Sequence, residues 1–240
     1  MGKTTLAALI VRGLLKKGKK PILVVDADPN TNLPEAVGIR CEATVGSILA
    51  GFIDDKASIP SGMTKESYLQ VKMHTAVAEG KGVDLVAMGR GEGPGCYCYP
   101  NLILRGFVED LSGNYPYVVI DNEAGMEHLS RRTSETIDHM ILVSDPSIRG
   151  LRSARRIHAL IDELNLDVAN ISLVVSRAPD PLPAPLEEEI KASGIPLLGK
   201  IPADKAIEEY DLAERPLTEL PDTSPAAEAS DQILEGLNLV

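Results

Sequence analysis

The sequence has few aromatic residues, few cysteines and no long apolar segment. Trp is absent and only 3% of the residues are aromatic, so a core has to be built mainly from Leu, Ile, Val and Ala. Three cysteines in 240 residues do not make a disulfide framework, and we therefore expect a reducing, cytoplasmic location. No stretch approaches the roughly 20 apolar residues that span a bilayer, so we expect no membrane partner.

An excess of basic residues is also lacking, because the formal net charge is −11. Proteins that bind nucleic acid without sequence specificity neutralise phosphates with a basic surface. We therefore expect no nucleic-acid partner. The short basic run Lys16, Lys17, Lys19 and Lys20 is typical of cations near the C-terminus of a helix, where the helix dipole favours them.

Buried-strand patterns alternate with amphipathic patterns along almost the whole chain. The clearest amphipathic stretch is 148–164, with apolar residues at helical spacing, and a final helix is expected at 226–237. Such alternation predicts an α/β fold of three layers, a mostly parallel sheet with helices on both faces, in one domain over residues 1–240. The expected strands are 21–26, 83–88, 117–121, 139–144, 171–176 and 196–201.

The chain begins with the tail of a phosphate-binding loop. Gly2-Lys3-Thr4-Thr5, followed by an apolar helix, matches the end of the pattern G-x-x-x-x-G-K-[ST]. In that pattern Gly lets the backbone approach phosphate, Lys3 would reach the β- and γ-phosphates, and the Thr4 hydroxyl would ligate Mg²⁺. The glycine-rich half of the loop and the strand before it are absent, so we expect an N-terminally truncated domain without its first strand and a true start upstream, which the intact mass of the native protein would test.

Carboxylates follow two of the expected strands. Asp26 and Asp28 come at the end of the strand 21–26, and Asp121 ends the strand 117–121. In α/β folds, ligands bind beyond the carboxyl ends of the parallel strands. Each Asp taken singly is also a common cap or turn residue. Their order after a phosphate loop favours a role in nucleotide binding.

A glycine-rich turn, 89–95, leads to Cys96-Tyr97-Cys98. Two thiolates two residues apart can bind one soft or borderline metal ion but leave it undercoordinated. A two-fold symmetric homodimer would supply four thiolates, which suit Zn²⁺ or Ni²⁺. The alternative is that both cysteines are small buried apolar residues near a helix start. The isolated Cys41 is interpreted as a packing residue.

Together these motifs, with the segment Asp121-Asn122-Glu123-Ala124-Gly125, resemble the CooC family of ATPases. This family assists nickel insertion into carbon monoxide dehydrogenase and is related to MinD and the nitrogenase iron protein. The resemblance implies a deviant Walker A P-loop fold, ATP and Mg²⁺ as cofactors, a homodimer that binds Ni²⁺ or Zn²⁺, and carbon monoxide dehydrogenase as the client.

The resemblance also implies roles for individual residues. Lys3 and Asp28 would be catalytic, with Asp28 orienting the attacking water. Asp121 would hold Mg²⁺ through water and Thr4 would ligate it directly, while Cys96 and Cys98 would hold the transported metal ion. The residues implied in nucleotide binding are Gly2, Lys3, Thr4, Thr5, Asp26, Asp121, Gly125 as a switch glycine, and Ser176 and Pro202 beside the base.

Three other functions share this pattern. The first is an iron–sulfur redox ATPase like the nitrogenase iron protein, since four thiolates also suit a cluster. The second is a positioning ATPase of the MinD or ParA kind without a metal. The third, amide-forming synthetase chemistry, would normally need a glutamine-hydrolysing domain, for which the chain has no room.

Overall fold

The computed structural model describes residues 2–54, 59–90, 98–123, 137–237 and 239. These divide into two compact units, and each is described by itself. Unit 1 comprises Met1–Gly18 and Ser134–Val240, and unit 2 comprises Lys19–Thr133.

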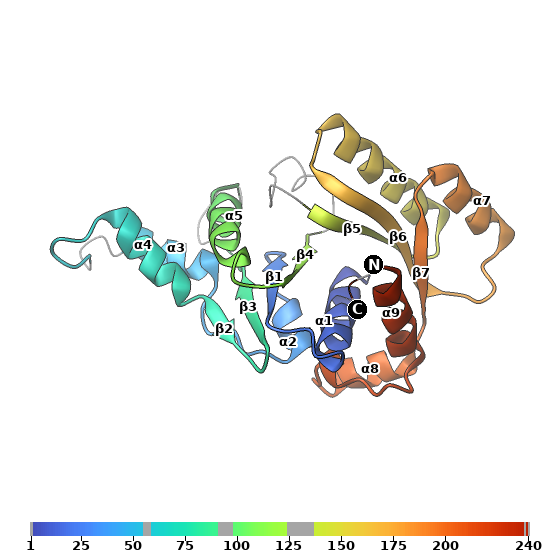
Figure 1. Cartoon of the computed structure of the whole chain (residues 1–240), viewed down its shortest axis with the longest axis horizontal. Helices are drawn as coiled ribbons and strands as arrows, with labels where there is room; N and C mark the ends of the chain where they lie inside the picture. Colours follow the sequence, from blue (N-terminus) through green and yellow to red (C-terminus); the bar gives the residue numbers. More distant parts are fainter. Residues whose placement is uncertain (1, 55–58, 91–97, 124–136, 238, 240) are drawn as a thin grey trace. The chain divides into compact units, whose positions relative to one another are not determined.

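Unit 2 is built on a four-stranded sheet with the strand order β2-β3-β1-β4 (Figure 1). Strands β1 (Ile22–Ala27), β3 (Val83–Ala87) and β4 (Tyr117–Asn122) are parallel, and the short β2 (Val77–Glu79) is antiparallel to β3. All six residues of β1 are buried, which explains why its sequence is a continuous apolar run that ends in Asp26 and Ala27.

The helices of unit 2 complete its core. Helix α5 contacts β1 and α3, and α3 also contacts α4. Apolar side chains of these elements form one cluster with the strands, including Leu23, Leu49, Met73 and Phe107. The helices are α2 (Leu33–Val37), α3 (Val45–Asp54), α4 (Lys65–His74) and α5 (Cys98–Ser112).

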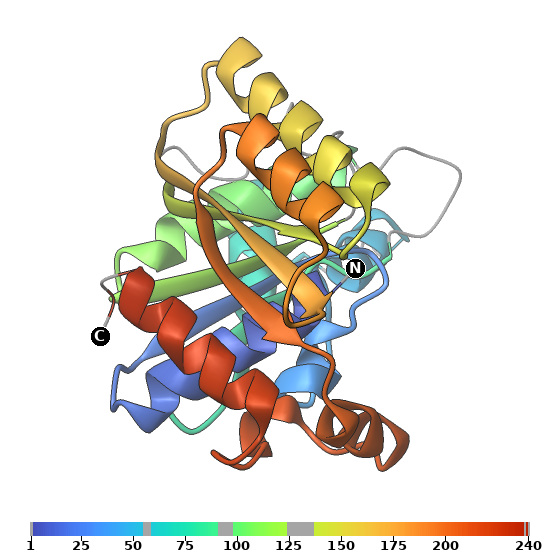
Figure 2. The same cartoon turned by 90° about the vertical axis from the view of Figure 1, so that its right-hand side faces the viewer.

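Unit 1 contains a parallel three-stranded sheet with the order β5-β6-β7. Helices α6 and α7 cover one face of this sheet, and α1 and α9 lie on the other face (Figure 2). The strands are β5 (Ile137–Ser144), β6 (Val168–Ala178) and β7 (Leu197–Pro202). The helices are α1 (Lys3–Lys16), α6 (Ile148–Glu163), α7 (Ala184–Ser193), α8 (Lys205–Leu212), the short 3₁₀ helix η3 (Leu217–Glu219) and α9 (Pro225–Gly236).

Two glycines let α9 lie close to its neighbours in unit 1. A Cβ on Gly13 of α1 would lie 2.2 Å from Leu234 Cδ1, and a Cβ on Gly199 of β7 would lie 2.6 Å from Ile233 Cγ1. Leu234 and Ile233 are both fully buried. The close packing of α9 against α1 and β7 therefore depends on the missing side chains at these two positions.

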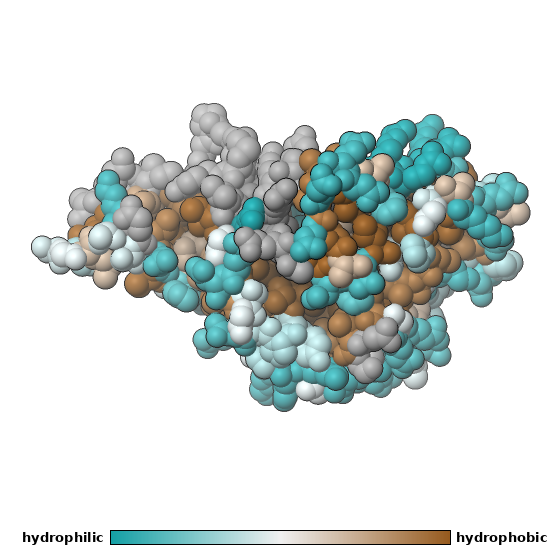
Figure 3. Space-filling model, turned by 45° about the horizontal axis from the view of Figure 1, so that its top comes forward, coloured by the Kyte–Doolittle hydropathy of each residue, from teal (hydrophilic) through white to brown (hydrophobic). Residues whose placement is uncertain are grey.

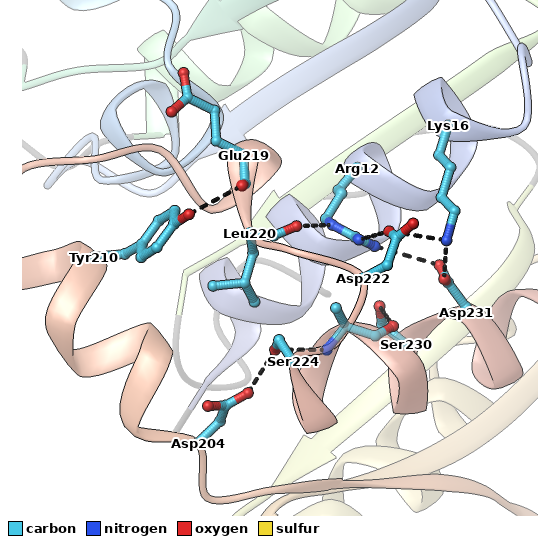
Figure 4. A network of polar contacts seen from close by, with 11 residues as sticks. Arg12, Lys16, Asp204, Tyr210, Glu219, Leu220, Asp222, Ser224, Ser230 and Asp231 are labelled. Carbon is cyan, nitrogen blue, oxygen red and sulfur yellow. Dashed lines mark hydrogen bonds and ion pairs between the residues drawn. The ribbon is translucent and has the colours of Figure 1, made fainter.

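A polar network joins α1 to the segment that follows η3 (Figure 4). The buried Arg12 donates from Nε to Leu220 O at 2.7 Å and forms ion pairs with Asp222 and, at 3.6 Å, with Asp231. Lys16 also pairs with both carboxylates, and these interactions, first that with Asp222, raise its pKa. The lysine run at the end of α1 thus has specific partners on the C-terminal part of unit 1.

The predicted fold class is confirmed, because both sheets are mostly parallel and the fold matches that of P-loop NTPases with helices on both sides. All six expected strands form, with ends shifted by at most a few residues, whereas β2 was not expected. The missing first strand stays a prediction; among the described residues, β4 and β5 are edge strands of their own sheets. No helix in the described part of the chain is long and apolar enough to cross a bilayer.

Candidate nucleotide-binding site

In unit 2, two buried carboxylates stand side by side at the carboxyl ends of adjacent strands. Asp26 on β1 is in register with Asp121 on β4, and their exposed fractions are 0% and 4%. Asp26 accepts hydrogen bonds from the backbone N–H groups of Asp28, at 3.0 Å, and Leu33, at 2.9 Å. Asp26 therefore fixes the turn between β1 and α2, and this turn carries Asp28.

Asp28 is less buried and belongs to the rim of the same turn. Its Oδ1 accepts hydrogen bonds from the backbone N–H and the side-chain amide of Asn30, both at 2.9 Å. Asn30 Oδ1 in turn accepts a hydrogen bond from Arg90, at 3.1 Å, beyond the end of β3. The turn after β1 is thus held by side chains from the same edge of the sheet, which keeps the Asp28 carboxylate in a fixed position.

The surroundings of Asp26 disfavour its ionised form. Burial raises the pKa of Asp26 to about 6, the two backbone N–H donors oppose the shift, and the charges of Asp121 and Asp28 add to it. A cation bound between two buried carboxylates would offset the repulsion of their negative charges and favour their ionised forms. The residues therefore fit Mg²⁺, which usually binds through one or two carboxylates while water and phosphate oxygens supply its other ligands.

A pH dependence follows from this pKa. The pKa of Asp26 is higher in the folded protein than its ordinary value of 3.8, so the folded state binds the proton more tightly. Without Mg²⁺, the contribution of Asp26 should lower the free energy of unfolding by about 1 kcal/mol as the pH rises from 5 to 7.5. Urea unfolding at both values measures the change, and Asp26→Asn should remove this part of it. An unchanged pH dependence in Asp26→Asn would contradict the assignment.

In unit 1, the start of α1 has the geometry of an anion site. Gly2 is the N-cap residue with a left-handed φ of 93°, and no side chain of the described residues caps the helix. The first turn contains no acidic residue. The N–H groups and the positive end of the dipole at Lys3, Thr4 and Thr5 therefore suit a phosphate group.

Ser176 lies directly beside this helix start. A Cβ on Gly2 would lie 2.9 Å from Ser176 Oγ, so only glycine fits against the buried serine. Ser176 stands near the carboxyl end of β6, and Pro202 ends β7, where it is in register with Ala178. Unit 1 thus brings Gly2, Ser176 and Pro202 to one end of its sheet, and Ser176 lies against Gly2, whereas the resemblance implied only that Ser176 contacts the base.

Hydrogen bonds of Asp204 fix the loop after Pro202 to its neighbours. Asp204 caps α8 by accepting from Ala206 N at 2.9 Å. Its other oxygen accepts from the hydroxyl of Ser224 (Figure 4) and from Ala226 N, at 3.1 Å. Burial alone would raise the pKa of Asp204, but the hydrogen bonds, above all that from Ser224, outweigh it and lower the pKa. The Pro202 loop is therefore anchored to the start of α9.

Some predicted site residues lie outside what the structure describes. Cys96 and Gly125 fall in the undescribed ranges 91–97 and 124–136, and Cys98 is described only as the backbone start of α5. Among the described residues, no group of three or more His, Cys, Asp or Glu side chains is placed to hold a metal ion. Cys41 is half-buried, and its thiol donates to Ala43 O at 2.9 Å, as expected of a packing residue.

Other residues near these edges were not expected from the sequence. Asp145 follows β5 and accepts a hydrogen bond from the Ser147 hydroxyl, at 2.6 Å, while Ser147 caps α6. The Asp-Pro-Ser-x-x-Gly pattern after a strand is a readable capping signal that would have located this turn. The Arg12 network had no such signal, because its partners are more than 200 residues away.

Comparison with known proteins decides the family. A family model described as an AAA domain matches residues 1–175, which is most of the chain. The chain belongs to this family. An ATP-binding protein of Methanocaldococcus jannaschii is 42% identical over 98% of this chain and 93% of its own length. The carbon monoxide dehydrogenase accessory protein CooC of Rhodospirillum rubrum is 27% identical over 89% of this chain and 84% of its own length.

Solved structures agree on the fold of this AAA domain protein. The cell division ATPase MinD of Pyrococcus furiosus covers 99% of the chain with a TM-score of 0.71 and 22% identity, and the chain covers 93% of it. MinD of Pyrococcus horikoshii, solved with Mg-ADP, gives the same TM-score at 21% identity, with coverages of 99% and 91%. The prediction of a P-loop ATPase is thus confirmed at the level of family and fold.

Proposed function

We propose that this ATPase is a dimeric metallochaperone that assists nickel insertion into carbon monoxide dehydrogenase. The observation that carries the proposal is the similarity to the accessory protein CooC over 89% of the chain, in a sequence that also contains Cys96 and Cys98 after a glycine-rich turn. The cysteines of two subunits would together supply four thiolates for one Ni²⁺ or Zn²⁺ ion.

Two features of the fold support a metal site at these cysteines. Helix α5 begins at Cys98, so this cysteine stands at a helix N-terminus, where the dipole stabilises negative charge such as that of a thiolate. The glycine-rich sequence before the two cysteines follows β3 along the chain, and β3 is the neighbour of β1, which contains Asp26 and is followed by Asp28. Because β1 and β3 are parallel neighbours, the turn after β1 and the residues directly after β3 lie at the same end of the sheet. A change in the turn after β1 would therefore occur close to the start of the sequence that leads to the cysteines.

ATP hydrolysis in this proposal depends on positioning and charge. Lys3 and the N–H groups at the start of α1 stabilise the phosphates, and Asp28 orients the attacking water. Mg²⁺, when bound, neutralises charge on the phosphates, and Asp26, Asp121 and Thr4 are the residues proposed to surround it. Loss of the γ-phosphate would release the turns after β1 and β4, which include Asp28 and Gly125.

The metal site is tested by the amount of metal that the protein binds. Nickel and zinc would be measured by mass spectrometry after dialysis, with and without ATP, for the wild type and for Cys96→Ala/Cys98→Ala. Cys41→Ala is the matched control, because its thiol is half-buried and hydrogen-bonded within unit 2. We expect one metal ion per two chains in the wild type and in the control, and none in the double variant.

A second candidate is a positioning ATPase of the MinD or ParA kind. It is favoured by the MinD and ParA structures, which cover 96–99% of the chain. Full ATPase activity without thiol-dependent metal binding would support this candidate and contradict the metallochaperone proposal. An iron–sulfur redox ATPase would instead show a visible absorption band after anaerobic purification.

A further inference from the structure

Helix α6 presents four exposed arginines in a chain whose net charge is −11. At 100° per residue these positions fall within about 120° of the helix circumference, opposite the buried residues Leu151, Ala154 and Ile161. Figure 3 shows a mostly hydrophilic surface over α6 and α7. The arginines, called here the α6 arginine surface, are Arg149, Arg152, Arg155 and Arg156.

Folding does not explain this concentration of positive charge. The first turn of α6 contains no acidic residue, and Arg149 stands in it, at the positive end of the helix dipole. Glu189 of α7 pairs with Arg152 at 3.2 Å and with Arg155 at 3.8 Å. Within the described ranges no carboxylate pairs with Arg149 or Arg156. Arg149 is therefore held against the dipole, and neither Arg149 nor Arg156 has a counter-charge among the residues that the structure describes.

The position of α6 connects this surface with the candidate phosphate site of the same unit. Ser144, the last residue of β5, is in register with Val175, next to Ser176, which contacts Gly2. The turn from Ser144 to Ser147 leads straight into α6, and a Cβ on Gly150 would lie 2.3 Å from Asp145 Oδ1 and 2.6 Å from Ser144 Oγ. The start of α6 is thus fixed to the sheet edge at which α1 begins.

We propose that the α6 arginine surface is a docking site for an acidic face of a partner protein. Guanidinium groups bind carboxylates through paired, parallel hydrogen bonds, so arginine suits such a face better than lysine does. A nucleic acid needs a continuous basic track, whereas the adjacent α7 carries Glu187, Glu188 and Glu189. Because α6 carries arginines and α7 carries glutamates, the two helices together suit a protein surface of mixed charge, with its acidic residues against α6. The proposal is independent of the metal that the protein binds.

The probe is a fluorescent 20-residue glutamate peptide, and its binding is measured by anisotropy in 50 mM salt. We expect the wild type to bind it, and Arg149→Gln/Arg156→Gln to bind it about tenfold more weakly. Lys191→Gln/Lys205→Gln is the control, because it removes the same charge from exposed positions outside α6 and should stay within about twofold of the wild type. Because the whole chain has a net charge of −11, non-specific electrostatic attraction would not make it bind an acidic peptide.

Three kinds of result would overturn the proposal. The first concerns the peptide: either it does not bind to the wild type, or the lysine control loses as much affinity as the arginine variant. Another is tighter, equally arginine-dependent binding of a 20-base-pair DNA duplex, which would assign the surface to nucleic acid. The third concerns stability: the arginine variant should melt at the wild-type temperature or above it, since it removes a cation from a helix N-terminus. Melting several degrees lower would assign the arginines to the fold.

Discussion

Lys3→Ala is expected to lower the rate of ATP hydrolysis at least about 100-fold, because it removes the cation that stabilises charge on the transferred phosphoryl group. The substitution should leave the fold intact. Lys3 is in the first turn of α1, where a cation opposes the helix dipole and alanine has the higher helix propensity. Phosphate release with saturating Mg-ATP measures the effect.

The matched control for this prediction is Lys191→Ala on α7. It changes the charge by the same amount at an exposed position of the same unit, and its activity should stay within about twofold of the wild type. Lys3→Ala with nearly full activity would show that the start of α1 does not bind the phosphates. Equal melting temperatures for the two variants would confirm that only the chemistry differs.

The second large effect concerns stability. Arg12→Ala is expected to reduce the free energy of unfolding by about 3–5 kcal/mol, because Arg12 is buried and its loss leaves charge and polar groups without a partner. Leu220 O loses its donor, and Asp231, whose Oδ1 is buried, loses the nearby guanidinium. Lys16 would still pair with Asp222 and Asp231, but it is partly exposed and so would not replace the buried charge of Arg12.

Arg215→Ala is the control for Arg12→Ala, because Arg215 is about half exposed and pairs with the equally exposed Glu219. Its loss should cost about 1 kcal/mol or less, since ion pairs and cation–π contacts of half-exposed arginines contribute little. Urea unfolding at pH 7.5 compares the two. A similar small loss in both variants would show that the network does not hold α1 to the C-terminal segment.

The sequence predicted the strands of both sheets because each is a short apolar run. Strand β2 was missed, since three half-exposed residues at a sheet edge, Val77–Glu79, carry no such pattern. Asp26 and Asp121 were expected at strand ends, and their order after the phosphate-loop motif predicted a role in nucleotide binding. Their register and the raised pKa of Asp26 depend on the sheet order and on burial, which no local pattern contains.

Other features of the site depend on contacts between distant segments. Arg12 lies in an apolar helix and reads as one more surface cation, yet its partners come from positions 220, 222 and 231. Gly2 was predicted to be a phosphate-loop residue, but its contact with Ser176 follows from the placement of α1 against the end of β6. Local motifs therefore predicted the chemistry, and tertiary packing decides which residues lie beside the predicted site.

The most direct test of the proposed function is the ATP-dependent activation of nickel-free carbon monoxide dehydrogenase. The purified enzyme would be incubated with limiting Ni²⁺ and this protein, and its carbon monoxide oxidation would be measured. We predict that activation requires ATP and is lost with Lys3→Ala and with Cys96→Ala/Cys98→Ala, but not with Cys41→Ala. Equal activation without ATP, or with the double cysteine variant, would contradict the account.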